Sequence, residues 1–104
     1  VSIGGTGEAA ADPRTIIRDL IALGAAAFIL CHNHPTGDPY PSRADRDTTT
    51  RLAALGVLLA VPLVDHVILG ARGTYFSFSE RGALPQLSQG TSPRALFELT
   101  AGAA

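Results

Sequence analysis

The chain has 104 residues, a formal net charge of −1 at pH 7 and 46% hydrophobic residues, which together predict one small folded domain with a buried core. A net charge this close to zero gives no general attraction for nucleic acid or for an anionic membrane surface. No apolar stretch reaches the roughly 18 residues of a membrane-spanning helix and no signal-peptide pattern is visible, so we expect a cytoplasmic protein without membrane contact. The chain starts at Val1 rather than Met, so we expect its N-terminal part to be missing.

The sequence of the first third of the chain predicts a strand end, a helix and a second strand, in that order. Residues 1–7, VSIGGTG, are typical of a strand that ends in a glycine-rich turn. Asp12 is a good N-cap with a proline after it, and apolar residues then follow helical spacing as far as Gly24. The apolar run AAAFILC, residues 25–31, predicts a short strand that is buried on both faces.

A turn-rich loop and a second helix follow this strand. Residues 33–41 contain three prolines, which restrict the backbone of the loop. From Ser42 a helix is predicted to run to about Leu55 and to end at Gly56, because glycine commonly terminates helices.

The remaining elements are two strands and a tail. Residues 63–69 and 74–78 predict strands, and the segment Ala71-Arg72-Gly73 predicts a hairpin between them. Residues 83–104 change in character, with a short helix predicted after Ser92, and we expect them to form a loosely attached tail. The order of the elements predicts an α/β fold in which a small mixed sheet is flanked by two helices.

Two histidines and an aspartate form a candidate metal site. Residues i and i+2 of a strand point to the same side, about 6.6 Å apart, so His32 and His34 can aim both imidazoles into one pocket. Cys31 points to the other side and is expected to fill the core. Asp45 is the natural third ligand, since the proline-stiffened loop can bring the start of the second helix back beside the histidines. Two imidazoles and one carboxylate are typical of a catalytic Zn²⁺ site with an open position for water, although Fe²⁺, Mn²⁺ and Co²⁺ accept the same ligands.

Each acidic or histidine side chain near this site also has a structural interpretation. The pattern Ser42-x-x-Asp45 is a helix-capping signature, so Asp45 is either a cap residue, a metal ligand or both. Asp38 is a rival ligand, but it lies between glycine and proline and is more typical of a turn. Asp65 and His66 follow one another in a strand and must point to opposite faces, so they cannot join one site. For His66 we expect a structural hydrogen bond, with a catalytic role as the alternative.

The stretch HNHPTGDPYPSRAD, residues 32–45, resembles the His-x-His-Pro…Ser-x-x-Asp motif of the JAMM (JAB/MPN) metalloproteases, and most closely their RadC-like bacterial branch. The segments DPRTIIRDLIALGAAAFIL (residues 12–30) and LVDHVILG (residues 63–70) are also similar to that branch. The likeness covers roughly residues 3–82. It implies that residues 1–82 form a JAB/MPN-like, RadC-like metal-binding domain of cytidine-deaminase-like architecture, with residues 83–104 as a tail outside the likeness.

The resemblance also implies roles for individual residues. By the family motif, His32, His34 and Asp45 are the metal ligands, and Ser42 hydrogen-bonds the catalytic water or steadies the oxyanion of the intermediate. Members of the superfamily hydrolyse peptide or isopeptide bonds. The resemblance therefore implies a zinc-dependent hydrolase in which a metal-bound water attacks such a bond in a peptide or protein substrate.

The chain departs from the family pattern at the general base. The family uses a glutamate from an earlier strand, but none of the three glutamates of this chain matches that position: Glu8, Glu80 and Glu98. General base catalysis contributes about 10²–10⁴-fold to a rate. We therefore expect this chain by itself to bind metal but to hydrolyse weakly or not at all.

Two other classes of function are alternatives. The RadC-like branch carries a DNA-repair label, which suggests a nucleic-acid-binding or nuclease module. Arg43, Arg46 and Arg51 on the second helix could contact phosphate, but arginines of this number also form an ordinary solvated face, and no basic stripe with stacking aromatics accompanies them. The third possibility is a non-catalytic scaffold that binds protein partners, against which the complete His/His/Asp set argues.

Overall fold

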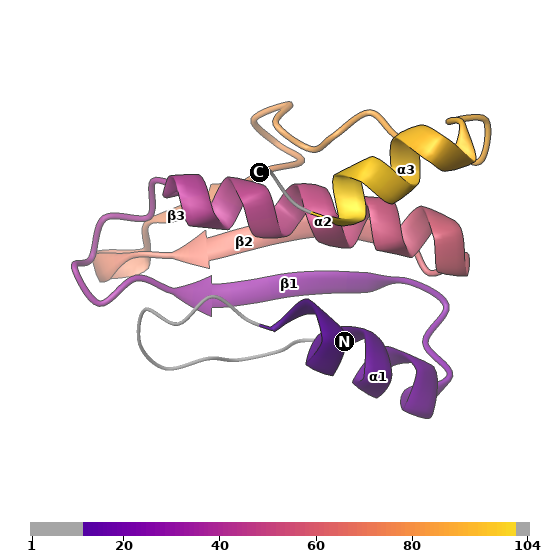
Figure 1. Ribbon diagram of the computed structural model, residues 1–104. Coiled ribbons are helices and arrows are strands. Elements are labelled where there is room, and N and C mark those ends of the chain that lie inside the picture. The colour runs from indigo at the N-terminus through magenta and orange to yellow at the C-terminus, as the bar shows by residue number, and fades with distance from the viewer. Residues whose placement is uncertain (1–11, 102–104) are drawn as a thin grey trace.

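In the computed structural model, residues 12–101 are described, and they fold into three α-helices and one three-stranded sheet (Figure 1). The strand order is β1-β2-β3. Strand β1 (Phe28–Asn33) runs parallel to β2 (Leu63–Leu69), and β3 (Tyr75–Ser77) runs antiparallel to β2. The predicted α/β fold with a small mixed sheet is confirmed, whereas the strand end predicted for residues 1–7 lies outside the described residues. Within the described part of the chain, no helix is both long and apolar enough to cross a bilayer.

Helix α1 (Pro13–Leu23) begins and ends where local signals predict. The Asp12 side chain accepts a hydrogen bond from the backbone of the first turn, and Gly24 takes the left-handed conformation that closes the helix, with φ of 64°. The helix buries Ile16 and Leu20 against the core.

Helix α2 (Arg43–Leu59) is longer than predicted. The expected end at Gly56 is wrong, because the helix continues through this residue and stops before Ala60, which takes the left-handed conformation with φ of 58°. The glycine serves packing instead: a Cβ atom at Gly56 would lie 2.6 Å from the backbone oxygen of Val61. The absence of a side chain therefore lets the chain fold back against the helix before entering β2.

Strand β1 is buried on one face only. Phe28 and Leu30 join α1 and α2 in one apolar core cluster, which also includes Leu52 of α2. Ile29, which strand alternation places on the other face, is 43% exposed. The prediction of a strand over residues 25–31 buried on both faces is thus wrong in its start and in its second face, because the apolar core lies on the face of Phe28 and Leu30.

The β2–β3 connection and the C-terminal segment complete the fold. A short 3₁₀ turn, Ala71–Gly73, joins the two antiparallel strands and confirms the predicted hairpin. Helix α3 (Pro93–Thr100) begins after Ser92 as predicted and lies along α2 (Figure 1). Leu96 of α3 is only 3% exposed, so α3 packs on α2, and the expectation of a loose tail is wrong for Pro93–Thr100.

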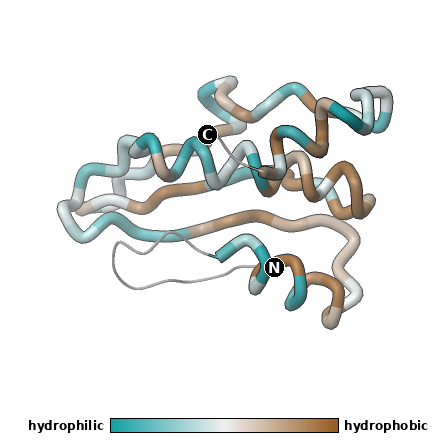
Figure 2. The backbone as a smooth tube through the Cα atoms, in the orientation of Figure 1, coloured by the Kyte–Doolittle hydropathy of each residue, from teal (hydrophilic) through white to brown (hydrophobic). Residues whose placement is uncertain are grey.

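Figure 2 shows that β1 and α2 each have a polar end and an apolar end. The polar end of β1 is its carboxyl end, and the polar end of α2 is its amino end. Because the loop of residues 34–42 joins these two ends, they lie next to each other (Figure 1). The apolar halves anchor both elements in the core, and the polar ends are left to form a site.

Candidate metal centre

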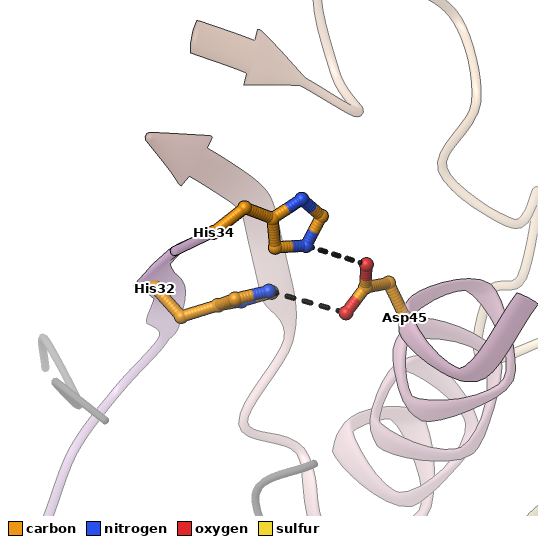
Figure 3. A group of neighbouring side chains, drawn as sticks. All are labelled: His32, His34 and Asp45. Atoms are coloured by element: carbon orange, nitrogen blue, oxygen red, sulfur yellow. Dashed lines mark hydrogen bonds and ion pairs between the residues drawn. The ribbon is translucent and has the colours of Figure 1, made fainter. Parts of the chain in front are cut away.

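The structure brings His32, His34 and Asp45 together at this polar end, and we call them the His–His–Asp group (Figure 3). The Nε2 atom of His32 lies 3.1 Å from Oδ1 of Asp45, and Nε2 of His34 lies 2.9 Å from Oδ2. Each of the three side chains offers one ligand atom within 4.8 Å of the others. The group is half-buried at the carboxyl end of β1, where strand alternation places both imidazoles on one side, and it could hold a metal ion.

Asp45 also caps α2. Its Oδ2 atom accepts a hydrogen bond from the backbone N–H of Ser42 at 2.7 Å, and its own backbone N–H donates to Oγ of Ser42 at 3.1 Å. This is the capping box that the Ser42-x-x-Asp45 spacing predicts. The cap fixes the carboxylate at the third position of the helix, so capping and facing the histidines are compatible uses of one side chain.

His34 is held from behind by the loop. Its Nδ1 atom lies 2.8 Å from the backbone oxygen of Asp38, and a carbonyl oxygen can only accept, so the proton of a neutral His34 ring is on Nδ1. The Nε2 atom therefore presents a lone pair toward Asp45. The Nε2 lone pair and the carboxylate oxygen, 2.9 Å apart, can both bind one cation, and imidazole nitrogen and carboxylate oxygen are common metal ligands.

Asp38 itself is a turn residue rather than part of the group. Its carboxylate accepts from the backbone N–H of Tyr40 at 3.0 Å, which closes a local turn. Its contribution to the site is the backbone oxygen that holds His34. The interpretation of Asp38 as turn chemistry is therefore confirmed.

His32 is held by a second histidine that comes from β2. Its Nδ1 atom lies 2.9 Å from Nε2 of His66, and Nδ1 of His66 lies 2.6 Å from Oγ1 of Thr49. The hydroxyl of Thr49 donates to the backbone oxygen of Asp45 at 2.7 Å. The expected structural hydrogen bond of His66 is confirmed, but Thr49 was not predicted as part of the site; its only signal in the sequence is its place one helical turn after Asp45.

Burial and hydrogen bonding set the protonation states that a metal site needs. Burial lowers the pKa of His32 from its ordinary value of 6.5, although the Asp45 carboxylate opposes the shift, and burial lowers the pKa of His66 to about 4. Burial by itself would raise the pKa of Asp45, but hydrogen bonding with Ser42 and the neighbouring histidines outweigh it and lower this pKa. At neutral pH, His32 and His66 are therefore uncharged and Asp45 is ionised.

Asp65, Glu80 and Glu98 have partners outside the His–His–Asp group. Asp65 accepts from the Ser77 hydroxyl at 2.6 Å and from the backbone N–H of Ser79 at 2.9 Å, so it closes the loop after β3. Glu80 accepts from the Tyr75 hydroxyl, and Glu98 pairs with Arg94 along α3. Glu8 lies outside the described residues.

Two of the three arginines considered for phosphate contact are engaged within the chain. Arg46 donates to the Tyr40 hydroxyl at 3.3 Å and lies over the ring of Tyr40. Arg51 donates to the backbone oxygen of Ala101 at 3.4 Å, which ties α2 to the end of α3. These contacts give Arg46 and Arg51 structural uses that need no nucleic acid.

Comparison with known proteins places the sequence in a family. Residues 1–83 match the family described as the RadC-like JAB domain. The chain is 45% identical over 85 residues to the UPF0758 protein BH3032 of Halalkalibacterium halodurans, which covers 82% of the chain and 36% of that relative. It is 46% identical over 84 residues to a UPF0758 protein of Thermotoga maritima, which covers 81% of the chain and 37% of the relative. A UPF0758 protein of Geotalea uraniireducens is 44% identical over 84 residues, or 81% of the chain and 36% of the relative.

The chain thus spans little more than a third of the length of these relatives. The match covers α1 to β3 and so includes every member of the His–His–Asp group, together with Thr49 and His66. The family match covers most of the chain, and the relatives are 44–46% identical to it over that part. The chain belongs to the RadC-like JAB domain family.

Proposed function

We propose that this chain is the metal-binding part of a zinc-dependent hydrolase of the JAMM type that cleaves peptide or isopeptide bonds. The observation that carries the proposal is the convergence of two imidazole Nε2 atoms and one carboxylate within 4.8 Å of one another. Two histidines and one carboxylate are a common ligand set of catalytic zinc, and they leave one coordination position open. This ligand set argues against a non-catalytic scaffold.

Such a cation would lower the pKa of a water ligand to near neutrality and polarise a substrate carbonyl. The residues of the chain have supporting tasks. The capping box fixes the Asp45 carboxylate, and the Asp38 carbonyl fixes the His34 ring. Ser42 accepts from the backbone N–H of Asp45 through Oγ, so its hydroxyl proton stays available to donate to the oxyanion that forms from the scissile carbonyl.

The general base is proposed to come from outside the described residues. Glu80 and Glu98 are the two described glutamates, and both are occupied by other side chains, Tyr75 and Arg94. Loss of a general base lowers rates by roughly 10²–10⁴-fold. We therefore expect this chain to bind zinc and to hydrolyse slowly, and the whole protein to hydrolyse faster.

The first test is the metal content of the purified chain after incubation with zinc and removal of excess metal. We expect one zinc ion per chain, and strongly reduced zinc in the variants His32→Ala and His34→Ala. The matched control is Asp38→Asn, which removes a carboxylate outside the His–His–Asp group and keeps the backbone oxygen that holds His34. Equal zinc content in the control and in the histidine variants would show that the His–His–Asp group does not bind the metal.

The second test concerns the reaction. A protein as long as the curated relatives is assayed with peptide, isopeptide and phosphodiester substrates, each with zinc and with a chelator. Cleavage of a peptide or isopeptide bond that is lost with the chelator supports the proposal. Zinc-dependent cleavage of the phosphodiester alone would replace it with a nuclease.

A further inference from the structure

The ring of His66 is fixed from several sides beneath the His–His–Asp group. It lies on the helix-covered face of β2, is only 1% exposed and stacks on Phe78 with 4.8 Å between ring centroids and an angle of 3° between the planes. Its two nitrogens contact Thr49 of α2 and His32 of β1. A buried ring with one stacking partner and two polar partners has a single orientation, so the hydrogen bonds of His66 have a fixed direction.

The direction follows from the chain of donors and acceptors. The backbone oxygen of Asp45 can only accept, so the single hydroxyl proton of Thr49 is donated to it. The Thr49 oxygen must then accept from Nδ1–H of His66, which leaves Nε2 of the neutral His66 ring as an acceptor. Only one donor remains for that atom, the Nδ1–H of His32 at 2.9 Å.

This order of protons leaves the Nε2 atom of His32 with a free lone pair, and Nε2 is the atom that faces Asp45. We propose that His66, held by Thr49, is a positioning residue that fixes His32 in the tautomer whose Nε2 atom can bind a cation. The proposal rests on the proposed metal site. It assigns His66 to the support of a ligand rather than to the core of the sheet.

The contacts form a closed ring that begins and ends at Asp45. The backbone oxygen of Asp45 orients Thr49, Thr49 orients His66, His66 orients His32, and His32 faces the Asp45 carboxylate. The ring ties the start of α2 to β1 through β2, so the two elements that supply the ligands are held at a fixed separation. The backbone oxygen of Asp38 in the loop fixes His34 in the same tautomer without His66, so His34 is a reference ring within the chain for the state of His32.

Loss of a hydrogen bond that supports a metal-binding histidine typically weakens metal affinity by roughly 10- to 100-fold. The test measures zinc affinity by competition with a chromophoric chelator in two matched pairs of variants. His66→Phe keeps a flat ring over Phe78 but has no polar atom, whereas His66→Gln can accept from His32 and donate to Thr49. Thr49→Val removes the hydroxyl, and Thr49→Ser keeps it.

We expect roughly 10- to 100-fold weaker zinc binding by His66→Phe, a smaller loss in Thr49→Val, and affinity within a few-fold of the unaltered chain in His66→Gln and Thr49→Ser. Equal affinity in His66→Phe and the unaltered chain would overturn the proposal. Because a phenyl ring in this position could disturb folding, the second measurement needs no variant. Two-bond proton–nitrogen NMR correlation spectra of the metal-free chain, at a pH where both rings are neutral, should show His32 and His34 protonated at Nδ1, and a proton on Nε2 of His32 would overturn the proposal.

The proposed metal site and the proposed role of His66 can be refuted separately. If the unaltered chain binds no zinc, the proposed function falls, and the role of His66 falls with it. If the unaltered chain binds zinc, His32→Ala does not, and His66→Phe binds as tightly as the unaltered chain, only the role of His66 is lost.

Discussion

Asp45 has two roles, capping α2 and facing the histidines, and the variants Asp45→Asn and Asp45→Ala separate them. Asparagine at this position can still accept the Ser42 backbone hydrogen bond through its side-chain oxygen, so it keeps the cap while it removes the charge. Alanine removes the charge and the hydrogen bond from the Ser42 backbone, but keeps the bond from the backbone N–H of residue 45 to Oγ of Ser42. We therefore expect Asp45→Asn to lose zinc binding with little change in the metal-free fold, and Asp45→Ala to lose both zinc binding and part of the stability of the fold.

The expected changes in stability follow from the capping contact of Asp45 and from zinc binding. Loss of a whole N-cap costs about 1 kcal/mol of unfolding free energy, with a range of roughly 0.5–2 kcal/mol, so loss of the Asp45 half of the capping box should cost about 1 kcal/mol or less. Zinc at a free concentration 100 times its dissociation constant stabilises the folded chain by about 2.7 kcal/mol. For a domain of about this size, 1 kcal/mol shifts the melting temperature by roughly 4–8 °C, so saturating zinc should raise it by roughly 11–22 °C.

The assay is thermal unfolding followed by circular dichroism, with zinc or with a chelator. The unaltered chain should melt at a higher temperature with zinc, and the chelator should reverse the gain. Asp45→Asn should melt near the metal-free temperature under both conditions, and Asp45→Ala should melt several degrees lower still. A zinc-dependent rise in Asp45→Asn as large as in the unaltered chain would mean that the carboxylate caps α2 and is not a zinc ligand.

Three further predictions concern the fold. Gly56→Ala should lower the free energy of unfolding by about 1–3 kcal/mol in urea titrations, because the new Cβ would lie 2.6 Å from the Val61 backbone oxygen. The control Gly90→Ala should change this free energy little, because the nearest atom to its new Cβ lies at an ordinary contact distance of 3.5 Å. The folded pKa of His66, about 4, lies below the unfolded value of 6.5, so the unfolded chain takes up a proton that the folded chain resists. The free energy of unfolding of the metal-free chain should therefore fall as the pH decreases from 6.5 to about 4, by at most about 1.4 kcal/mol per pH unit. His66→Phe should remove this part of the pH dependence, and an unchanged slope would contradict the assignment of the low pKa to His66. Leu96→Ala should destabilise the chain by about 2–5 kcal/mol in the same titrations, and no effect would mean that α3 does not pack on α2 in solution.

Local signals in the sequence predict the elements that depend on local physics. Asp12 and Gly24 mark both ends of α1 because a cap and a left-handed turn are made by residues next to the helix. Gly56 carries the same signal as Gly24, yet α2 continues through it. The difference is a contact with the returning chain at Val61, and a contact of that kind is not visible in the helix sequence itself.

The site shows the same division between local and distant contacts. Strand alternation predicts that His32 and His34 share a side, and the capping spacing places Asp45 at the start of α2. The sequence leaves open whether Asp45 caps or faces the histidines, and the structure shows both: Oδ2 accepts from the Ser42 backbone and also faces His34, and Oδ1 faces His32. The contact between Thr49 and His66 joins α2 to β2 across 17 residues of sequence, and no local pattern predicts such a pair.

We propose that His32, His34 and Asp45 hold one divalent cation and leave a coordination position open. X-ray absorption spectroscopy of the zinc-loaded chain reports the ligand atoms around the metal and so distinguishes this coordination shell from others. We expect one zinc ion with two imidazole nitrogens at about 2.0–2.1 Å, the rest of the shell made of oxygen, and no sulfur. A sulfur ligand at about 2.3 Å, which would implicate Cys31, or a shell without imidazole would contradict the account.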